Sequence, residues 1–190
     1  MATKLLAYWA VNLTEIPLTA HNAALRSLYN YIGCAIGGSN HPTVKKAYAA
    51  LSPLLGNSTS CLLGSASKSD AQHAALLNGI ASHVHDYDDT HLATIIHPTA
   101  PVASALLAYV ELQGTPLRGE ELLTALVAGI ETSCKLGLAV WPEHYDIGWH
   151  ITGTTGVIGA AVGVGKLMHL SETEMMHAIG IAAVNAIGLR

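Results

Sequence analysis

The sequence predicts an all-α protein, a multi-helix bundle, and three observations support this class. Apolar residues recur at the i, i+3, i+4 spacing of an amphipathic helix through most of the 190 residues. Hydrophobic residues make up 51% of the chain and aromatic residues only 5%, with no Phe, so small and aliphatic side chains must form close helix contacts. Only residues 59–63 look extended, which is too little for a sheet.

Eight segments carry the helical spacing, and no internal repeat or low-complexity linker separates them. In chain order, the predicted helices are residues 4–13, 19–37, 41–51, 69–85, 97–112, 118–140, 152–170 and 171–187. We therefore expect a single helical domain over residues 1–190, with no internal boundary.

Local signals mark several helix ends. The GGSN at 37–40 ends the second segment, and the GTP at 114–116 ends the fifth. The SETE at 171–174 matches a capping box, which starts the last helix. Three glycines within 159–165 fall inside a helical Ala/Val pattern, where tight packing against another helix is the ordinary explanation.

The last predicted helix is apolar on nearly every face between residues 175 and 189. A helix of this kind needs protein cover all round. A partner subunit or further chain would supply that cover, and burial at the centre of its own bundle is the alternative.

The composition argues against several kinds of partner. A net charge of −4 with scattered Lys and Arg offers no surface for a nucleic-acid backbone. Residues 147–165 are uncharged, but their His, Thr and Gly make them too polar for a membrane span. Glu15 and Pro17 interrupt the N-terminal apolar run, so we expect no signal peptide. The expected location is the cytoplasm, with the mitochondrion as the alternative.

The densest group of proton-handling side chains lies within residues 83–98. On a helix, Asp86 and Thr90 lie four residues apart and share a face, so we expect the carboxylate and the hydroxyl to act together. Asp88 and Asp89 would point elsewhere, and we expect them to cap the next turn. A solvated polar loop between two helices is the alternative for the whole run.

Two histidines stand at predicted helix starts. His97 precedes a proline, which is favoured in the first helical turn. His150 precedes TGTTG at 152–156, where small residues leave the helix N–H groups open to a ligand. The two starts would attract the same carboxylate groups, so they predict an anionic substrate, with Thr152 at its binding site. For each histidine alone, a structural hydrogen bond is the alternative.

Metal and nucleophile chemistry are less favoured. Residues 83–91 offer metal donors, but His83 and His85 lie on different faces of a helix, and no HExxH or CxxC motif accompanies them. We expect no metal and no other cofactor. The cysteines, which are odd in number, lie in apolar surroundings that would raise a thiol pKa, and no GxSxG motif is present. They are Cys34, Cys61 and Cys134.

Taken together, these motifs resemble the MmgE/PrpD family, which includes 2-methylcitrate dehydratase, cis-aconitate decarboxylase and iminodisuccinate epimerase. The motifs that carry the resemblance are AALLNG at 74–79, HDYDDT at 85–90, HP at 97–98, GIE at 129–131 and GWHITGT at 148–154. They occur in the family's order and approximate spacing, and the resemblance covers nearly the whole chain.

The resemblance implies a helical domain that holds an active site against a smaller lid domain, in a homodimer. Family members are more than twice this length, so we expect the N-terminal part of the helical domain, incomplete at its C-terminus and without the lid. In the cis-aconitate decarboxylase branch, the residues that match Asp86, Thr90, His97 and His150 line the substrate pocket. Lysines and a tyrosine later in the family's chain contribute as well.

From the resemblance and the residues, we expect a cofactor-independent lyase for a small di- or tricarboxylic acid, which dehydrates or decarboxylates it by proton transfer next to a carboxylate. The candidate catalytic residues are Asp86, His97 and His150, and Thr90 and Thr152 are the candidate substrate-binding residues. An epimerase or isomerase of the same family, such as iminodisuccinate epimerase, is one alternative. A truncated, non-catalytic helical association protein is another.

Overall fold

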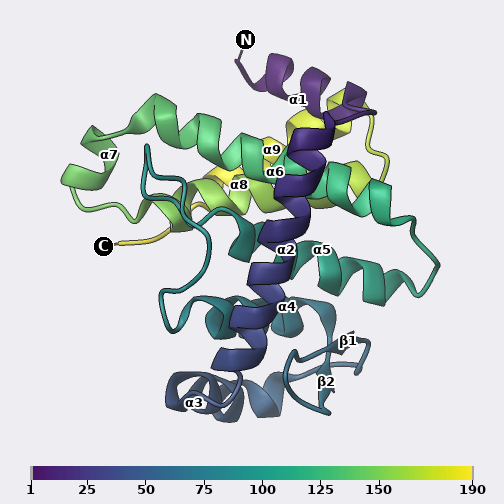
Figure 1. Cartoon of the computed structure of the whole chain (residues 1–190), viewed down its shortest axis with the longest axis vertical. Coiled ribbons are helices and arrows are strands. Elements are labelled where there is room, and N and C mark those ends of the chain that lie inside the picture. Colours follow the sequence, from purple (N-terminus) through teal and green to yellow (C-terminus); the bar gives the residue numbers. More distant parts are fainter. Residues whose placement is uncertain (1, 190) are drawn as a thin grey trace.

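The computed structural model describes residues 2–189, and its fold is almost entirely helical, which confirms the predicted class (Figure 1). Within these residues, helices follow one another with one short hairpin between the third and the fourth. The elements are α1 (Ala2–Asn12), α2 (Leu18–Gly38), α3 (Pro42–Leu51), a 3-10 turn (Ser52–Leu54), β1 (Ser60–Cys61), β2 (Lys68–Ser69), α4 (Ala71–His83), α5 (Thr99–Gln113), α6 (Gly119–Val140), α7 (Glu143–Asp146), α8 (Ile151–Leu167) and α9 (Glu172–Val184).

Each of the eight predicted segments corresponds to a helix, and the differences lie at the ends. Helix α4 stops at His83, although the pattern extends to residue 85. The segment predicted as extended contains β1, which pairs antiparallel with β2. Helix α7 was not predicted, because a single turn is too short to show a 3.6-residue period.

Helix α2 runs along the length of the molecule and contacts α4, α5 and α6 as it crosses them (Figure 1). Helix α8 packs against α5, α6 and α9. Helix α3 lies beside α4, at the end of the molecule opposite α1 (Figure 1). The two helices that were predicted to begin next to histidines, α5 and α8, are therefore neighbours in space.

Helices α6 and α8 make a close contact through two glycines. A Cβ added at Gly129 would lie 2.7 Å from the carbonyl oxygen of Gly159, and one added at Gly159 would lie 2.5 Å from that of Gly129. Gly163 and Gly165 also face close neighbours, Ala125 and Met175 respectively. The tight helix packing expected of these glycines is confirmed.

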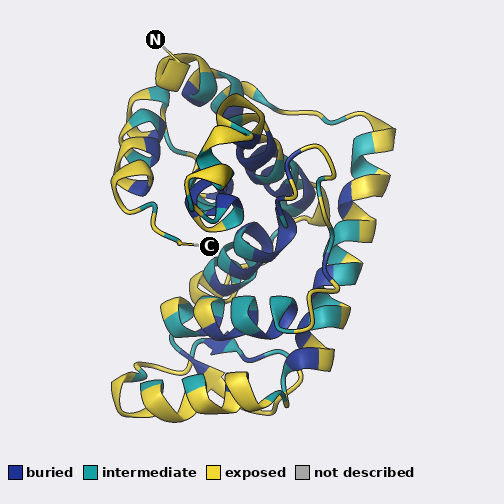
Figure 2. Ribbon diagram, turned by 90° about the vertical axis from the view of Figure 1, so that its left-hand side faces the viewer, coloured by how far each residue is buried: buried dark blue, intermediate teal, exposed yellow. Residues whose placement is uncertain are grey.

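Two groups of buried side chains fill the space between the helices. The larger group joins α5 to α6 and includes Val102, Leu106 and Leu126. The smaller one lies under α1 and α9 and includes Val162 and Met175. Figure 2 shows the buried residues concentrated where helices meet, whereas α3, at the lower end, is largely exposed. The core is therefore aliphatic, as the composition indicates.

The helix ends follow the predicted signals. Ser171 accepts the backbone N–H of Glu174, whose side chain accepts the backbone N–H of Ser171, so the capping box is present. Gly114 follows α5 in the left-handed conformation, at φ 65°, which is the usual glycine stop.

Helix α9 is not buried at the centre of the bundle, so that alternative was wrong. Met175, Ile179 and Ala182 pack inward, but Ile181 is 64% exposed and Val184 is 84% exposed. The helix lies at the edge of the molecule, where α8 and α1 cover one side of it. Its outer apolar face has no cover among the described residues.

One helix among the described residues, α6, is long and apolar enough to cross a membrane. More than half of its most apolar window, 56%, is buried inside the protein. Because the core helix of a globular protein has the same length and composition, this is weak evidence for a membrane span.

We predict that Gly159→Ala destabilises the protein by about 1–3 kcal/mol, because the new methyl group would press on the Gly129 backbone and separate α6 from α8. Urea unfolding followed by circular dichroism measures this change. Gly33→Ala is the matched control, since Gly33 is an exposed glycine in α2 with open space around it. That variant should be slightly stabilised, by about 0.5–1 kcal/mol. Equal effects of the two substitutions would contradict the packing argument.

Candidate active site

The five predicted site residues, which are spread over 67 positions of the sequence, line a single cavity of about 630 Å³. The cavity lies between the loop that joins α4 to α5 and the start of α8. Its lining residues are His83, Asp86, Thr90, Ile95, His97, Tyr145, His150, Ile151 and Thr152. The two histidines expected at helix starts therefore share one cleft.

Asp86 and Thr90 reach this cavity by a different route from the one predicted. Helix α4 ends at His83, so the two residues lie on a loop and do not share a helix face. Asp86 has a left-handed backbone, with φ 53°, and its N–H donates to the carbonyl of His83 in a tight turn. A non-glycine residue in this conformation breaks a helix, which explains the error.

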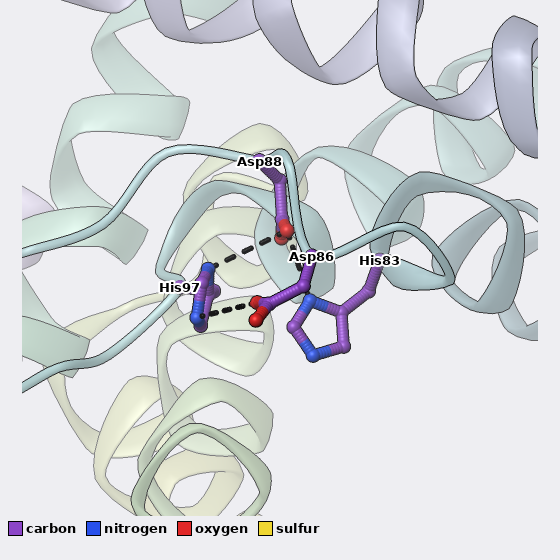
Figure 3. Close-up of side chains that lie close together, drawn as sticks. All are labelled: His83, Asp86, Asp88 and His97. Carbon is purple, nitrogen blue, oxygen red and sulfur yellow. Dashed lines mark hydrogen bonds and ion pairs between the residues drawn. The ribbon is translucent and has the colours of Figure 1, made fainter.

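Asp88 and Asp89 do not serve as helix caps, which corrects a second expectation. The Asp88 side chain is only 1% exposed, and its Oδ1 lies 2.9 Å from His83 Nδ1 and 3.4 Å from His97 Nδ1 (Figure 3). Asp89 Oδ2 accepts the hydroxyls of Ser27 at 3.0 Å and Thr99 at 2.6 Å. Asp89 therefore anchors the loop to α2 and α5, whereas the Asp88 carboxylate lies within ion-pair distance of two imidazoles.

A small turn positions His97 at the cavity. His91 and Ile96 form an isolated antiparallel bridge, in which the His91 N–H donates to the Ile96 carbonyl at 2.8 Å. Ile95 between them has φ 52°, which is rare for a β-branched residue, and backbone strain of this kind gathers at functional sites. Ile96 is fully buried against Gly137 of α6, and this contact fixes the position of the turn.

A hydrogen bond joins the loop to α8. The backbone N–H of His97 donates to Thr152 Oγ1 at 3.0 Å. This bond uses Thr152 as an acceptor, so its own hydroxyl hydrogen can still be donated to a ligand. Thr90 is exposed, and its hydroxyl lies 3.5 Å from His97 Nδ1. Both threonines thus lie beside His97 at the cavity.

His150 is the N-cap of α8, as its position in the sequence indicates. Its Nδ1 accepts the backbone N–H of Gly153 at 3.1 Å, which leaves the ring proton of the neutral form on Nε2. Burial, followed by the nearby imidazoles of His83 and His97, lowers the pKa of His150. His150 therefore favours the neutral form and presents Nε2–H.

His83 is a site residue that the sequence analysis considered only as a metal donor. The hydrogen bond to Asp88 raises the pKa of His83, and it outweighs the opposing effect of burial. His83 and His150 line the same cavity with pKa values shifted in opposite directions, as is common where one group donates a proton and another accepts it. The five-residue separation of His83 from Asp88 gave no signal, because only the loop brings them together.

An apolar chamber of about 620 Å³ adjoins the polar cavity. The two share His83, His97, His150 and Thr152. The chamber is otherwise lined mainly by small and aliphatic side chains, among them Leu76, Ile80, Val84, Ala100, Pro101, Val157 and Ala160. The cleft therefore has one polar end and one apolar end.

Four donor groups in the cleft are close enough to share a cation. Atoms of His83, Asp86, Asp88 and His97 lie within 4.8 Å of one another. His83 Nδ1 already bonds to Asp88 Oδ1, and a proton shared between these two atoms satisfies both. We interpret these four residues as imidazole–carboxylate pairs that share protons. That the protein uses no metal cofactor stays a prediction.

The cysteines are free thiols with raised pKa values, as predicted. Burial is the main cause for Cys34, and for Cys134 it raises the pKa to about 11. Cys61 differs from the expectation, because its main cause is a hydrogen bond with the carboxylate of Glu111. None of the three lines the cleft.

The fold and the cleft define a class of helical proteins in which histidines and carboxylates meet at the starts of packed helices. Residues 4–190 match the family model of the MmgE/PrpD N-terminal domain. The chain therefore belongs to the MmgE/PrpD family, and the resemblance seen in the sequence is confirmed.

Named relatives support this assignment. The chain is 31% identical to the cis-aconitate decarboxylase-like protein oryM of Aspergillus oryzae, over 97% of the chain and 40% of that protein. It is 28% identical to the cis-aconitate decarboxylase of Aspergillus terreus, over 98% of the chain and 39% of that enzyme. The human cis-aconitate decarboxylase is 37% identical over 60% of the chain and 24% of its own length. The chain thus spans about 40% of the length of its fungal relatives.

We predict that His83 titrates at a higher pH than His150, as measured from imidazole C–H shifts in an NMR titration. His83 gains affinity for its proton on folding, so its stabilising contribution is complete at acidic pH and disappears as the pH rises through its raised pKa. The contribution of His150 to stability has the opposite sign, because the folded protein binds the His150 proton less tightly than the unfolded chain does. Protonation of His150 therefore destabilises the fold as the pH falls below about 6.5. The reverse order of titration would contradict the assigned contacts.

Proposed function

We propose that the polypeptide carrying this chain is a lyase that acts on a small di- or tricarboxylic acid, by dehydration or decarboxylation. One observation carries the proposal. His97 and His150 are 53 positions apart in the sequence, and both line one cleft, together with two hydroxyl groups and a third imidazole. The names of the relatives, which are cis-aconitate decarboxylases, support the same class of substrate.

The cleft is suited to a ligand with several carboxylates. The hydrogen bond to Asp88 raises the pKa of His83, which favours a positive charge on that imidazole. The start of α8 adds the positive end of a helix dipole at Thr152, and the Thr152 and Thr90 hydroxyls add hydrogen-bond donors. A cation, a helix start and hydroxyls around one cavity recognise a carboxylate in complementary ways. The apolar chamber beside them can receive the carbon skeleton of the substrate.

The dehydration needs one group that takes a proton and one that gives it, whereas the decarboxylation needs only a group that gives a proton. In a dehydration, one imidazole removes a proton from the carbon next to a carboxylate. The freed electron pair forms the C=C bond, and hydroxide leaves as water with a proton from the second group. In a decarboxylation, the C–C bond to the carboxylate breaks and carbon dioxide leaves. The electron pair stays on the substrate carbon, which a protonated imidazole then protonates.

In the proposal His97 takes the proton, His83, whose pKa is raised, supplies one, and His150 donates a hydrogen bond from Nε2–H to the substrate. His97 Nε2 lies 3.4 Å from Asp86 Oδ1, so the exposed Asp86 carboxylate can orient the ring or assist a proton transfer. His150 presents Nε2–H, because its Nδ1 is occupied by the Gly153 N–H. The rings of His97 and His150 enter the cleft from the starts of different helices, which allows a substrate to lie between them.

We predict that the natural polypeptide carrying this chain converts at least one of three acids: cis-aconitate, methylcitrate or iminodisuccinate. Proton NMR of the reaction mixture identifies the product. His97→Ala and His150→Ala should each lower kcat by about 10²–10⁴-fold, since the first removes a proton acceptor and the second removes an Nε2–H donor to the substrate. His177→Ala, on the exposed face of α9, is the matched control and should leave turnover unchanged. Turnover that is unaffected by both cleft substitutions would refute the assignment.

The same assay tests the epimerase alternative. A lyase changes the number of C=C bonds or releases carbon dioxide, whereas an epimerase returns the same constitution with one inverted centre. In deuterated water, an epimerase also exchanges the proton at that centre. Inversion of iminodisuccinate with no change in the other two acids would assign the protein to the epimerase branch.

Association is the second candidate function, and the outer face of α9 favours it. Ile181, Val184, Ile187 and Leu189 are 64–84% exposed, which forms an apolar face along the last helix and its tail. We propose a homodimer as the partner arrangement. Light scattering after size exclusion should give a mass near twice 19.8 kDa for this chain. Val184→Lys should lower that mass and Leu54→Lys, at an exposed site in the 3-10 turn, should not. A monomeric wild-type chain would contradict association.

A further inference from the structure

We infer that Asp88 is a positioning residue, whose buried carboxylate holds the His83 and His97 rings with their Nε2 atoms directed away from it and toward the cleft (Figure 3). This inference rests on the proposed function, since it assigns a purpose to Asp88 within the same site. Sequence reasoning gave Asp88 only the task of a helix cap.

The geometry joins both imidazoles to one oxygen atom. Asp88 Oδ1 accepts a hydrogen bond from His83 Nδ1 at 2.9 Å and lies 3.4 Å from His97 Nδ1. The two ring centroids are 4.7 Å apart and the ring planes meet at 60°. Because Nδ1 and Nε2 lie on opposite sides of an imidazole, a carboxylate that holds Nδ1 sets the direction of Nε2. One carboxylate therefore orients two rings.

The burial of Asp88 shows that the imidazoles are its main compensation. The side chain is 1% exposed, and its Oδ2 has no hydrogen-bond partner among the described residues. Burial of an unpaired carboxylate is costly, and such a group is retained where a nearby cation neutralises it. His83 and His97 are the groups in ion-pair range, so the pair of rings and the carboxylate share protons as one unit.

Anchoring of the loop does not account for Asp88, because Asp89 carries that task. Asp89 Oδ2 accepts the Ser27 and Thr99 hydroxyls, and its backbone N–H donates to Asn30 Oδ1 at 3.0 Å. These bonds tie the loop to two helices without any contribution from the Asp88 side chain. Asp89 thus anchors the loop, whereas the Asp88 side chain contacts the two imidazoles. A substitution at Asp89 therefore serves as the control for a purely structural role.

Other charged groups face the two rings less closely or with more solvent. Asp86 Oδ1 is 3.4 Å from His97 Nε2, but the Asp86 side chain is 77% exposed, so water weakens its effect. His150 lines the same cleft from α8 and favours the neutral form. The Thr90 hydroxyl, a hydrogen-bond partner of His97 Nδ1 at 3.5 Å, is uncharged and can serve as donor or acceptor. Asp88 is therefore the buried charge that decides which ring nitrogen of His83 and His97 carries the first proton.

This arrangement has a chemical consequence for His97. With Asp88 Oδ1 3.4 Å from its Nδ1, the ring favours the Nδ1–H tautomer, which offers the Nε2 lone pair to a substrate proton. The imidazolium that forms is stabilised by the negative charge behind it. Without that charge, either nitrogen can carry the proton, and the fraction of rings ready to accept one falls.

The test compares Asp88→Asn with Asp89→Asn by long-range ¹H–¹⁵N correlation spectra of the histidine rings, recorded in EDTA so that no metal contributes. In the wild type we expect the Nδ1–H tautomer for both His83 and His97. Asp88→Asn should lower the titration midpoint of His83 by about one pH unit and mix the tautomers of His97. Asp89→Asn keeps an amide oxygen that can accept the Ser27 and Thr99 hydroxyls, so the loop keeps its path and both readouts should stay unchanged. Equal spectra in the wild type and Asp88→Asn would overturn the inference.

Activity provides a second, separate readout in the natural polypeptide. Asp88→Asn should lower kcat at least tenfold and shift the pH profile of kcat, with a smaller effect on KM. If the wild type converts none of the acids, the proposed function fails, while the tautomers and midpoints still decide the role of Asp88. If Asp88→Asn does not fold, the wild-type spectra alone decide, because an Nε2–H tautomer of His83 or His97 would contradict the inference.

Discussion

The glycine face of α6 fixes the positions of the elements that carry the cleft. Gly129 lets α8 and Val102 of α5 approach within van der Waals contact, and Gly137, two turns further on, receives the buried side chain of Ile96. Ile96 directly precedes His97, and α8 begins at His150. Because all three contacts are made to one rigid helix, the distance between the two imidazoles is set by backbone packing.

The electrostatics of the cleft follow from that packing. Asp88 is buried beside two imidazoles, and its hydrogen bond raises the pKa of His83. Burial, followed by the nearby imidazoles of His83 and His97, lowers the pKa of His150. The two pKa values thus shift in opposite directions within one cavity. The exposed Asp86 stands at the opposite side of the His97 ring, where water moderates its charge.

Most of the fold could be predicted from local patterns. Apolar periodicity indicated the eight longer helices, and capping signals such as the box at 171–174 placed several ends. The failures lie where no local period exists. Helix α4 ends two residues early because Asp86 adopts a left-handed turn, and the one-turn α7 is too short to detect. The sequence indicated that α9 needs cover, but only the tertiary structure showed which side lacks it.

By itself, the sequence determined the helical class, the family and the residues with the chemistry of the cleft, because these depend on composition, periodicity and motifs read along the chain. Only the tertiary structure decided which of those residues meet. Asp88 was expected to cap a helix, and His83 was considered only as a metal donor, yet they form the closest ion pair in the cleft. Their partnership depends on a loop path set by Asp89, Ile96 and contacts with distant helices. Such long-range contacts leave no periodic trace among neighbouring residues.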